Sequence, residues 1–224
     1  QFSVTHAVRE YHYTLYYYDQ AGNLVKTVPP EGVHPRYATS FIDSVDAART
    51  NRTSYVPVHT LATQYRYNTL NQVVAQWTPD AAQSQFWYDR LGRLVVSQNA
   101  RQKAASATES NRLYSYTNYD ALGRITEVGE IKNLGSTAIT DGLTRLSTSL
   151  LDWLNYSATG KGQVTTTVYD QGYAGFTAGL EPLVQRNLRN RVAYTSITKG
   201  NNPAQFDAAT FYSWLRKQDE SLPS

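Results

Sequence analysis

Aspartate recurs along this chain in a fixed setting, and a recurring acid is the first residue type that could do chemistry. Each copy follows a tyrosine and precedes a glycine by three positions, so that the motif reads Tyr-Asp-x-x-Gly-x-Leu. Paired carboxylates can act as general acid and base. Catalysis rarely needs the same acid in every repeat, however, whereas Asp accepts N–H bonds within its own turn and Gly adopts a positive φ. The pattern therefore favours turn formation over catalysis.

Three strong copies and one weak copy carry the motif. The strong copies are residues 18–24 (YDQAGNL), 88–94 (YDRLGRL) and 119–125 (YDALGRI), and the weak copy is 67–73 (YNTLNQV). The predicted turn residues are Asp19 and Gly22, Asp89 and Gly92, Asp120 and Gly123, and, in the weak copy, Asn68 and Asn71. A type I turn followed by a left-handed residue is a common hairpin connection, and Asn tolerates that conformation next best after Gly.

A fifth copy is degenerate. Tyr169-Asp170 lacks the glycine at the right distance, and residues 188–192 (LRNRV) look like the second half of a unit. The spacing between copies is uneven, so we expect insertions in the longer gaps.

Strands are predicted on both sides of each turn. Tyr11, Tyr13, Leu15 and Tyr17 share one parity, and a second alternating run follows each glycine. Because an isolated hairpin is marginal in water, the units must pair edge to edge. The expected fold is mainly β: an array of antiparallel β-hairpins that forms a large curved sheet or shell section, with one or two short inserted helices.

The motif copies resemble the YD-repeat, or Rhs-repeat, family, most closely over residues 16–24 and 86–94, and the resemblance covers roughly residues 11–30, 63–130 and 164–198. It implies a section of a larger bacterial protein that is secreted or lies at the cell surface, whose repeats form a hollow shell. In toxin members the shell encloses a C-terminal effector, and other members act in adhesion. Implied partners are neighbouring repeats of the same longer chain, an enclosed effector or secretion machinery, and glycans. The family's self-cleavage stretch has no match here.

The chain divides into repeat and non-repeat segments. The predicted segments are a hairpin (1–30), a loop insert with a short helix (31–62), consecutive hairpins (63–130), an inserted helix (131–163, helical at about 142–155), degenerate repeat strands (164–198), and a loop with a divergent tail (199–224). Asp141 is the expected cap of the 142–155 helix, whose apolar stripe is Leu143, Leu146, Leu150 and Leu154. Thr39 or Ser40 is the expected cap of the earlier helix. Residues 99–110 are expected to form a loop or a frayed helical turn, and 203–216 suit either helix or strand.

Other candidate residues give no catalytic, cofactor or metal site. Glu127 and Glu130 could face a sugar as acid and base, but their position favours solvated surface. The four histidines lack His-x-x-x-His spacing, and the chain has no cysteine. Residues 160–162 (GKG) lack the remainder of a phosphate loop, so that a turn is favoured. We therefore expect no enzyme activity.

Binding surfaces are suggested by the aromatic content, with 18 Tyr and 4 Trp. Trp77 and Trp87 are the candidate glycan contacts, because exposed aromatic rings stack on sugars. Arginines at 186, 189 and 191 form a cluster that fits a strand face better than nucleic-acid binding. The net charge of +3 is too small to indicate nucleic-acid binding by itself. No apolar run is long enough to span a membrane.

Two functions remain open. The first is a non-catalytic section of a secreted shell that encapsulates or presents an effector, in which paired strands make a wall and Asp-x-x-Gly turns set its pitch. The alternative is a surface adhesin whose aromatic rows bind glycans. The absence of Met and of a signal peptide leads us to expect a piece of a longer polypeptide.

Overall fold

Alternating aromatic and polar residues form strands over most of the chain. The computed structural model describes residues 12–175, 185–199 and 206–214. Within them the strands are antiparallel and follow one another in chain order in one sheet. They are β1 (Leu15–Tyr18), β2 (Leu24–Val28), β3 (Thr63–Tyr67), β4 (Val73–Thr78), β5 (Ala82–Tyr88), β6 (Leu94–Gln98), β7 (Leu113–Tyr119), β8 (Ile125–Lys132), β9 (Lys161–Tyr169), β10 (Val192–Thr198) and β11 (Ala208–Phe211). The predicted mainly β fold of antiparallel hairpins is confirmed. Tyr11, His6 and the tail beyond Trp214 lie outside the described residues.

A common register defines the hairpins. The motif tyrosine pairs with the residue six positions later, and the next residue of the second strand is skipped in the pairing. The pairs are Tyr18 with Leu24, Tyr67 with Val73, and Tyr119 with Ile125. A skipped residue of this kind is a β-bulge, which increases the local twist of the strand. These three copies therefore make the same bulged hairpin.

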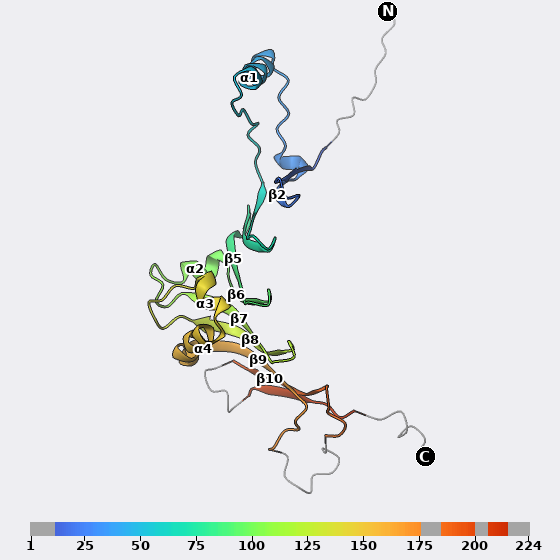
Figure 1. Cartoon of the computed structure of the whole chain (residues 1–224), viewed down its shortest axis with the longest axis vertical. Helices are drawn as coiled ribbons and strands as arrows, with labels where there is room; N and C mark the ends of the chain where they lie inside the picture. Colours follow the sequence, from blue (N-terminus) through green and yellow to red (C-terminus); the bar gives the residue numbers. More distant parts are fainter. Residues whose placement is uncertain (1–11, 176–184, 200–205, 215–224) are drawn as a thin grey trace, which may run out of the picture. The chain divides into compact units, whose positions relative to one another are not determined.

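The strands fall into two units that divide within β5, between Gln85 and Phe86. The first unit carries helix α1 (Thr39–Thr50), which begins and ends with extended connections (Figure 1). None of the residues of α1 is buried. Among the described residues of this unit, the buried apolar side chains are those of Val28 and Ala75. The first unit is therefore held mainly by its strand pairing.

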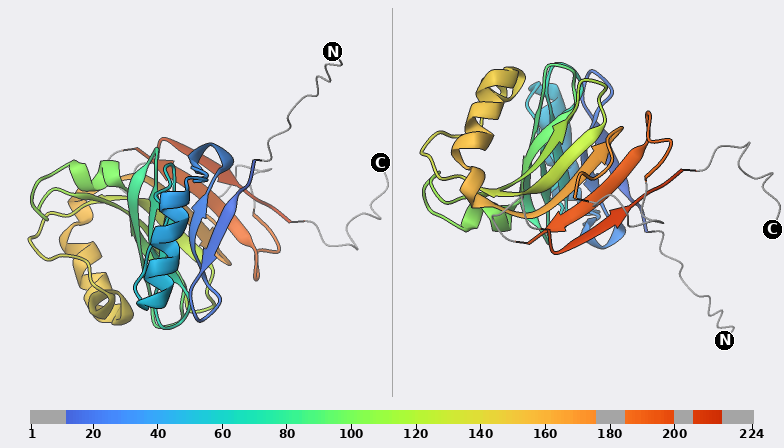
Figure 2. Two further views of the ribbon diagram at one scale, coloured as in Figure 1. Left: turned by 90° about the horizontal axis from the view of Figure 1, so that it is seen from above. Right: turned by 90° about the horizontal axis from the view of Figure 1, so that it is seen from below.

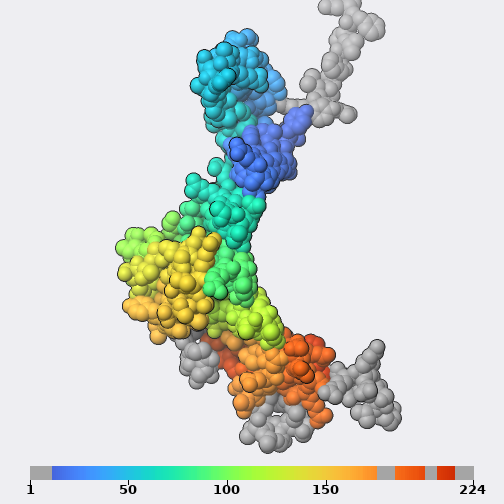
Figure 3. Space-filling view, viewed as in Figure 1, coloured from blue at the N-terminus to red at the C-terminus, as the bar shows by residue number. Residues whose placement is uncertain are grey.

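A hydrophobic core lies in the second unit, where helices pack on the strands (Figure 2). Helix α4 (Ser147–Tyr156) buries Leu150, Trp153 and Leu154, which recur at the three- and four-residue spacing of one helix face. The Trp153 ring meets the Tyr114 ring of β7 edge-on, with 5.6 Å between centroids. In the space-filling view the atoms of α4 rest on this unit without a visible gap (Figure 3). Helix α4 therefore closes the core over the sheet.

The helix expected over 142–155 is two helices in the structure. Helix α3 (Asp141–Arg145) and α4 are separated at Leu146, whose backbone is extended at φ −98° and ψ 108°. The cap is Thr140, whose hydroxyl accepts the Leu143 N–H, rather than the predicted Asp141. Leu146 is 55% exposed instead of lying in the apolar stripe. The break allows the Thr144 hydroxyl to donate to the Tyr88 carbonyl at 3.0 Å, which ties α3 to β5.

The remaining inserts are short. The expected helix in 31–62 is α1, but its N-cap is Ala38 without a side-chain cap, in place of Thr39 or Ser40. Residues 99–110 contain α2 (Ala100–Ala104), which a reciprocal capping box between Asn99 and Gln102 stabilises. Two single-turn 3-10 helices lie at Pro30–Gly32 and Ala158–Gly160. The ambiguous 203–216 segment contains strand β11, and residues 203–205 lie outside the described part.

Candidate functional site

Each strong Tyr-Asp copy folds into the same turn, which its aspartate stabilises. In the second copy the Asp89 N–H donates to the Arg93 carbonyl at 2.9 Å, and the Gly92 N–H donates to the Asp89 carbonyl at 3.1 Å. The Asp89 Oδ1 atom accepts the N–H groups of Leu91 and Arg93, both at 2.9 Å. The same four bonds recur in the first and third strong copies. The carboxylate is thus occupied in shaping the turn.

The predicted glycine position requires a left-handed backbone. The φ angles are 83° at Gly22, 76° at Gly92 and 80° at Gly123. In the weak copy Asn71 has a φ of 56°. In the degenerate fifth copy Asn190 has a φ of 58°. A side chain in this region costs roughly 1–2 kcal/mol, which Asn reduces by local hydrogen bonding. The sequence motif therefore reflects a conformational requirement of the backbone.

The weak copy keeps the turn with an amide in place of the carboxylate. The Asn68 N–H donates to the Gln72 carbonyl at 2.9 Å, and the Asn68 Oδ1 atom accepts the N–H groups of Leu70 and Gln72. One acceptor oxygen satisfies these donors whether it is charged or neutral. The turn therefore requires an acceptor oxygen and not an ionisable acid, whereas acid–base catalysis requires the ionisable group.

Arginines after the glycine hold the second carboxylate oxygen. The Nε and Nη2 atoms of Arg93 both lie 2.7 Å from the Asp89 Oδ2 atom. Arg124 instead bridges two turns, with Nε 2.7 Å from Asp120 and Nη2 2.7 Å from Asp170. The Arg124 hydrogen bond lowers the pKa of the Asp170 carboxyl. At Asp120, partial burial acts to raise the pKa, but the bonds from Arg124 outweigh it and lower the pKa below its ordinary value.

Neighbouring hairpins are joined through the motif tyrosine. The Tyr119 hydroxyl donates to the Leu94 carbonyl of the preceding hairpin at 2.9 Å, and the Arg93 guanidinium lies 4.4 Å from the centre of the Tyr119 ring. The same donation recurs from Tyr169 to Ile125 at 3.1 Å and, in the first unit, from Tyr67 to Leu24 at 2.8 Å. Sequence reasoning missed this role. The recurrence of Arg one position after the glycine was the signal that could have indicated it.

Tyr119→Phe should lower the free energy of unfolding by about 1 kcal/mol, because the ring remains and one hydrogen bond between hairpins is lost. Tyr18→Phe is the matched control. Tyr18 holds the same motif position, is 63% exposed, and follows no earlier hairpin among the described residues. Its replacement should leave the urea unfolding midpoint unchanged. Equal midpoints for the two variants would show that the Tyr119 bond does not join the hairpins.

The degenerate fifth copy is a complete turn with an insertion inside it. Tyr169 pairs with Val192, and the Asp170 N–H donates to the Arg191 carbonyl at 3.1 Å, as in the shorter turns. The Asn190 N–H donates to the Asp170 Oδ1 atom, and Asn190 supplies the positive φ. Residues 188–192 are therefore the second half of the unit, as expected from the sequence.

Trp214 replaces the tyrosine of the next copy. Its indole N–H donates to the Val192 carbonyl at 2.9 Å, and the Arg191 guanidinium lies 5.1 Å from its ring. These are the two contacts that Tyr119 makes with the preceding hairpin. The sequence placed Trp214 in the divergent tail of residues 199–224. An indole supplies the same aromatic face and a single donor, so that the contact survives the substitution.

The two tryptophans predicted to contact glycans lie in different surroundings. Trp87 packs against the core, with 6.1 Å between its ring centroid and that of Tyr114. Trp77 lies on β4 and is partly buried, and the Arg66 guanidinium lies 5.7 Å from its ring. Neither ring is among the exposed large side chains of the described residues. The exposed aromatic residues include Tyr16 and Tyr18, which share one face of β1.

Glu127 and Glu130 point to opposite faces of the sheet, because they stand three positions apart in a regular pairing with β7. Glu127 accepts from the Tyr116 hydroxyl and the Lys161 ammonium, both at 2.7 Å. Burial, with the bond to Glu127, raises the pKa of Tyr116. Glu130 accepts from the Gln102 amide at 3.1 Å. Both glutamates are half-buried and hydrogen-bonded rather than fully solvated, and the two acids do not flank one site.

Two of the four histidines meet in the first unit. The backbone N–H of His34 donates to the His59 Nδ1 atom at 3.3 Å. The Nε2 atom of the His34 ring lies 3.0 Å from the Thr60 hydroxyl oxygen. Burial, followed by the charge of Lys26, lowers the pKa of His59. Among the described residues no group of three or more His, Asp or Glu side chains could hold a metal ion.

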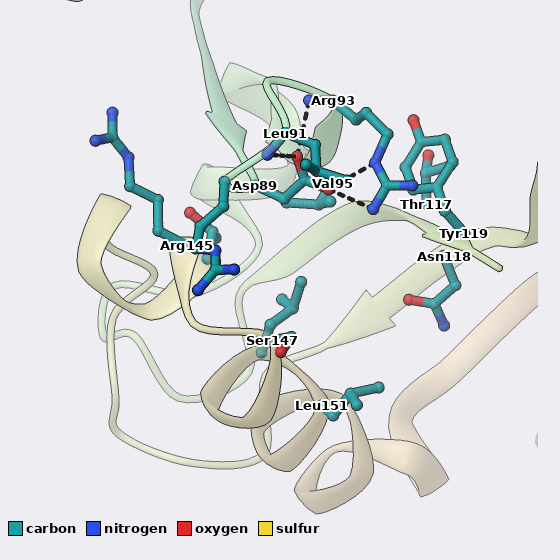
Figure 4. A pocket seen from close by; sticks show the side chains of 13 residues that line it. Asp89, Leu91, Arg93, Val95, Thr117, Asn118, Tyr119, Arg145, Ser147 and Leu151 are labelled. Atoms are coloured by element: carbon teal, nitrogen blue, oxygen red, sulfur yellow. Dashed lines mark hydrogen bonds and ion pairs between the residues drawn. The ribbon is translucent and has the colours of Figure 1, made fainter. Parts of the chain in front are cut away.

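A surface pocket of about 320 Å³ lies between the Asp89 turn and helices α3 and α4. Figure 4 shows Arg93 bound to Asp89 on the turn, with Ser147 and Leu151 on the helical side. Val95 and Leu150 are buried at its edge. No motif in the sequence indicated this pocket, because it depends on where α3 and α4 rest. None of the described helices has the length and apolar character required to cross a membrane.

The fold and the turns define an antiparallel array of bulged hairpins. No protein-family model matches the chain, and no curated protein matches it. Solved structures with low similarity include TcdB2–TccC3–TEV (15% identity, 82% of this chain, 6% of that chain, TM-score 0.39) and TcdB2–TccC3 without its hypervariable C-terminal region (14%, 92%, 8%, 0.36). Another is a Tc holotoxin pore from Photorhabdus luminescens (16%, 88%, 9%, 0.32). The chain spans less than a tenth of each. These values assign no family.

Proposed function

We propose that the chain is a structural section of a secreted or cell-surface YD-repeat (Rhs-repeat) shell, and that it works without catalysis. The observation that carries the proposal is the repeated turn, in which the same aspartate or asparagine oxygen accepts the same two N–H groups. A row of identical turns sets a constant spacing between hairpins, which a wall needs and an active site does not. We base the proposal on these turns and not on the solved structures of low similarity.

The contacts between hairpins support the same role. Within each unit, a motif tyrosine joins its hairpin to the preceding one at the turn end: Tyr67 in the first unit, and Tyr119 and Tyr169 in the second. Arg124 adds an ion pair that spans two turns. The partners of such a section are the adjoining repeats of a longer chain and the polypeptide that the shell encloses or presents, such as an effector or toxin.

Limited proteolysis of the full-length protein tests enclosure. Polypeptide inside the wall should resist a protease that digests the same polypeptide when it is produced alone. Disruption of the wall by Gly123→Val should remove this protection. Digestion of the candidate cargo at the same rate within the full-length protein and when produced alone would contradict enclosure.

A glycan-binding adhesin is the second candidate, favoured by the exposed rings of Tyr16 and Tyr18 on one face of β1. Binding to a glycan array that is lost in Tyr16→Ala but retained in Trp87→Phe would support it, since Trp87 is partly buried against the core. The absence of binding across a broad array would count against it.

A further inference from the structure

The pocket beside the Asp89 turn carries an excess of positive charge. Its lining includes the guanidinium groups of Arg90, Arg93 and Arg145 and one carboxylate, that of Asp89. Arg93 is already bound to Asp89 through two nitrogens. Arg90 and Arg145 are exposed, and neither forms an ion pair with another described residue. Two guanidinium groups are therefore available to an anionic ligand, with donors in the fork geometry that suits carboxylates.

Apolar side chains stand beside these charges. Leu91, on the tip of the turn, is 76% exposed, and Leu151, on α4, is 52% exposed. Both line the pocket, and Val95 and Leu150 form its buried apolar part. A single exposed leucine needs no explanation, but two exposed leucines that line the same pocket can bind an apolar group. The pocket thus pairs an apolar contact with cationic donors.

The apolar part of this combination recurs at the next turn, where the arginine is already bound to Asp120 and Asp170. Leu122 occupies the position of Leu91 in the following hairpin and is 71% exposed, and Arg124 occupies the position of Arg93. Strands β6 and β7 pair directly, so that successive turn tips lie two strand spacings apart, or about 10 Å. A polypeptide in polyproline II conformation covers about this distance in three residues, and every third side chain lies on the same face. A ligand that repeats along its length fits both positions better than a small anion does.

We propose that this surface, from the Arg90–Arg145 pocket to Leu122, binds an acidic segment of polypeptide in polyproline II conformation. Carboxylates of the segment pair with Arg90 and Arg145, and its apolar side chains, three residues apart and therefore on one face, contact Leu91 with Leu151 and then Leu122. Charge complementarity selects the acidic class of partner, and the exposed leucines require it to carry apolar side chains as well. The inference does not require that the wall enclose a cargo.

Fluorescence anisotropy on the 224-residue chain tests the proposal. The probe is a dye-labelled peptide in which leucines recur every third position with glutamates between them. Arg90→Gln combined with Arg145→Gln should weaken binding about tenfold or more, because two charge-assisted contacts are lost. Arg101→Gln combined with Lys103→Gln is the matched control, since it removes two cations from α2, away from the pocket lining. This control should change the affinity by less than about twofold.

Three further arms separate the alternatives. Leu151→Ser should also weaken the peptide, and a peptide of equal composition with its leucines adjacent should bind less well. Circular dichroism of each variant shows whether the fold is retained. If the α2 control variant weakens peptide binding equally, the peptide is held by general charge attraction and the proposal is overturned. Displacement of the peptide by inorganic phosphate or glucuronate, with no effect of Leu151→Ser, would identify a small-anion site and also overturn it, as would the absence of peptide binding.

Discussion

Gly123→Val is expected to lower the free energy of unfolding by about 2 kcal/mol, because valine must adopt a left-handed backbone that its branched Cβ disfavours. The φ of Gly123 is 80°. A Cβ atom there would lie 3.8 Å from the Arg93 Nη1 atom, which is an ordinary contact. The cost therefore arises from the backbone angle and not from a clash. Urea unfolding followed by circular dichroism measures it.

Gly142→Val provides the control for this substitution. Gly142 lies in α3 with an ordinary φ, and a Cβ atom there would meet the Thr140 hydroxyl at 3.9 Å. Removal of a helical glycine costs nothing in conformational entropy, so stability should stay within about 0.5 kcal/mol of the original protein. A Gly123 variant as stable as the Gly142 variant would show that the turn does not require a left-handed residue.

Trp153→Ala is expected to cost about 3–5 kcal/mol, the largest effect of a single substitution considered for this chain. Trp153 is buried in the core cluster and contacts the Tyr114 ring of β7 edge-on. Its loss removes a large apolar surface and leaves a cavity between α4 and the sheet. We expect a large drop in the urea midpoint and weaker protection of α4 amides in hydrogen exchange.

Two variants control for this effect. Trp153→Phe keeps an aromatic ring, and the indole N–H has no hydrogen-bond partner among the described residues, so that the cost should be near 1 kcal/mol. Leu151→Ala, on the exposed side of the same helix, should cost less than about 1 kcal/mol. If Leu151→Ala lowers the free energy of unfolding as much as Trp153→Ala does, α4 is not held by its buried face.

The turns could be predicted from the sequence because their requirements are local. Asp19, Asp89 and Asp120 bond to N–H groups two and four residues later, and the positive φ falls within the same few residues. The strands follow from period-two alternation, which is also local. Even the interrupted fifth copy could be recognised, since both halves keep their own residue types.

Features that depend on packing could not be predicted in this way. The leucine stripe predicted one helix, but the bond from Thr144 to the Tyr88 carbonyl fixes α3 on the hairpin and the chain turns at Leu146. Trp87 packs against the core through the Tyr114 ring, which itself contacts Trp153 of α4, and no local pattern indicates this. The role of Trp214 depends on a hydrogen bond to a residue 22 positions earlier. Periodicity gives the faces of an element but not what covers them.

The repeated aspartates therefore have a structural role that can be stated atom by atom. One carboxylate oxygen shapes the turn, and the other binds the arginine that lies over the next tyrosine. In the second unit this arrangement joins the Asp89 and Asp120 hairpins to the hairpins that follow them, with groups that the motif itself supplies. The motif thus produces the same turn in each strong copy, and the pocket lies where the inserted helices α3 and α4 meet one of these turns.

Disulfide trapping tests the edge-to-edge stacking of hairpins most directly, because the chain contains no cysteine. Val128 of β8 and Thr165 of β9 are exposed partners across two successive hairpins. Directly opposed Cα atoms lie about 4.5–5.5 Å apart, within the range of a disulfide. We predict that Val128→Cys with Thr165→Cys forms an intramolecular disulfide on mild oxidation, and that Val128→Cys with Thr166→Cys, which point to opposite faces, does not. No disulfide in the first pair, or equal yields in both, would contradict the stacked-hairpin wall.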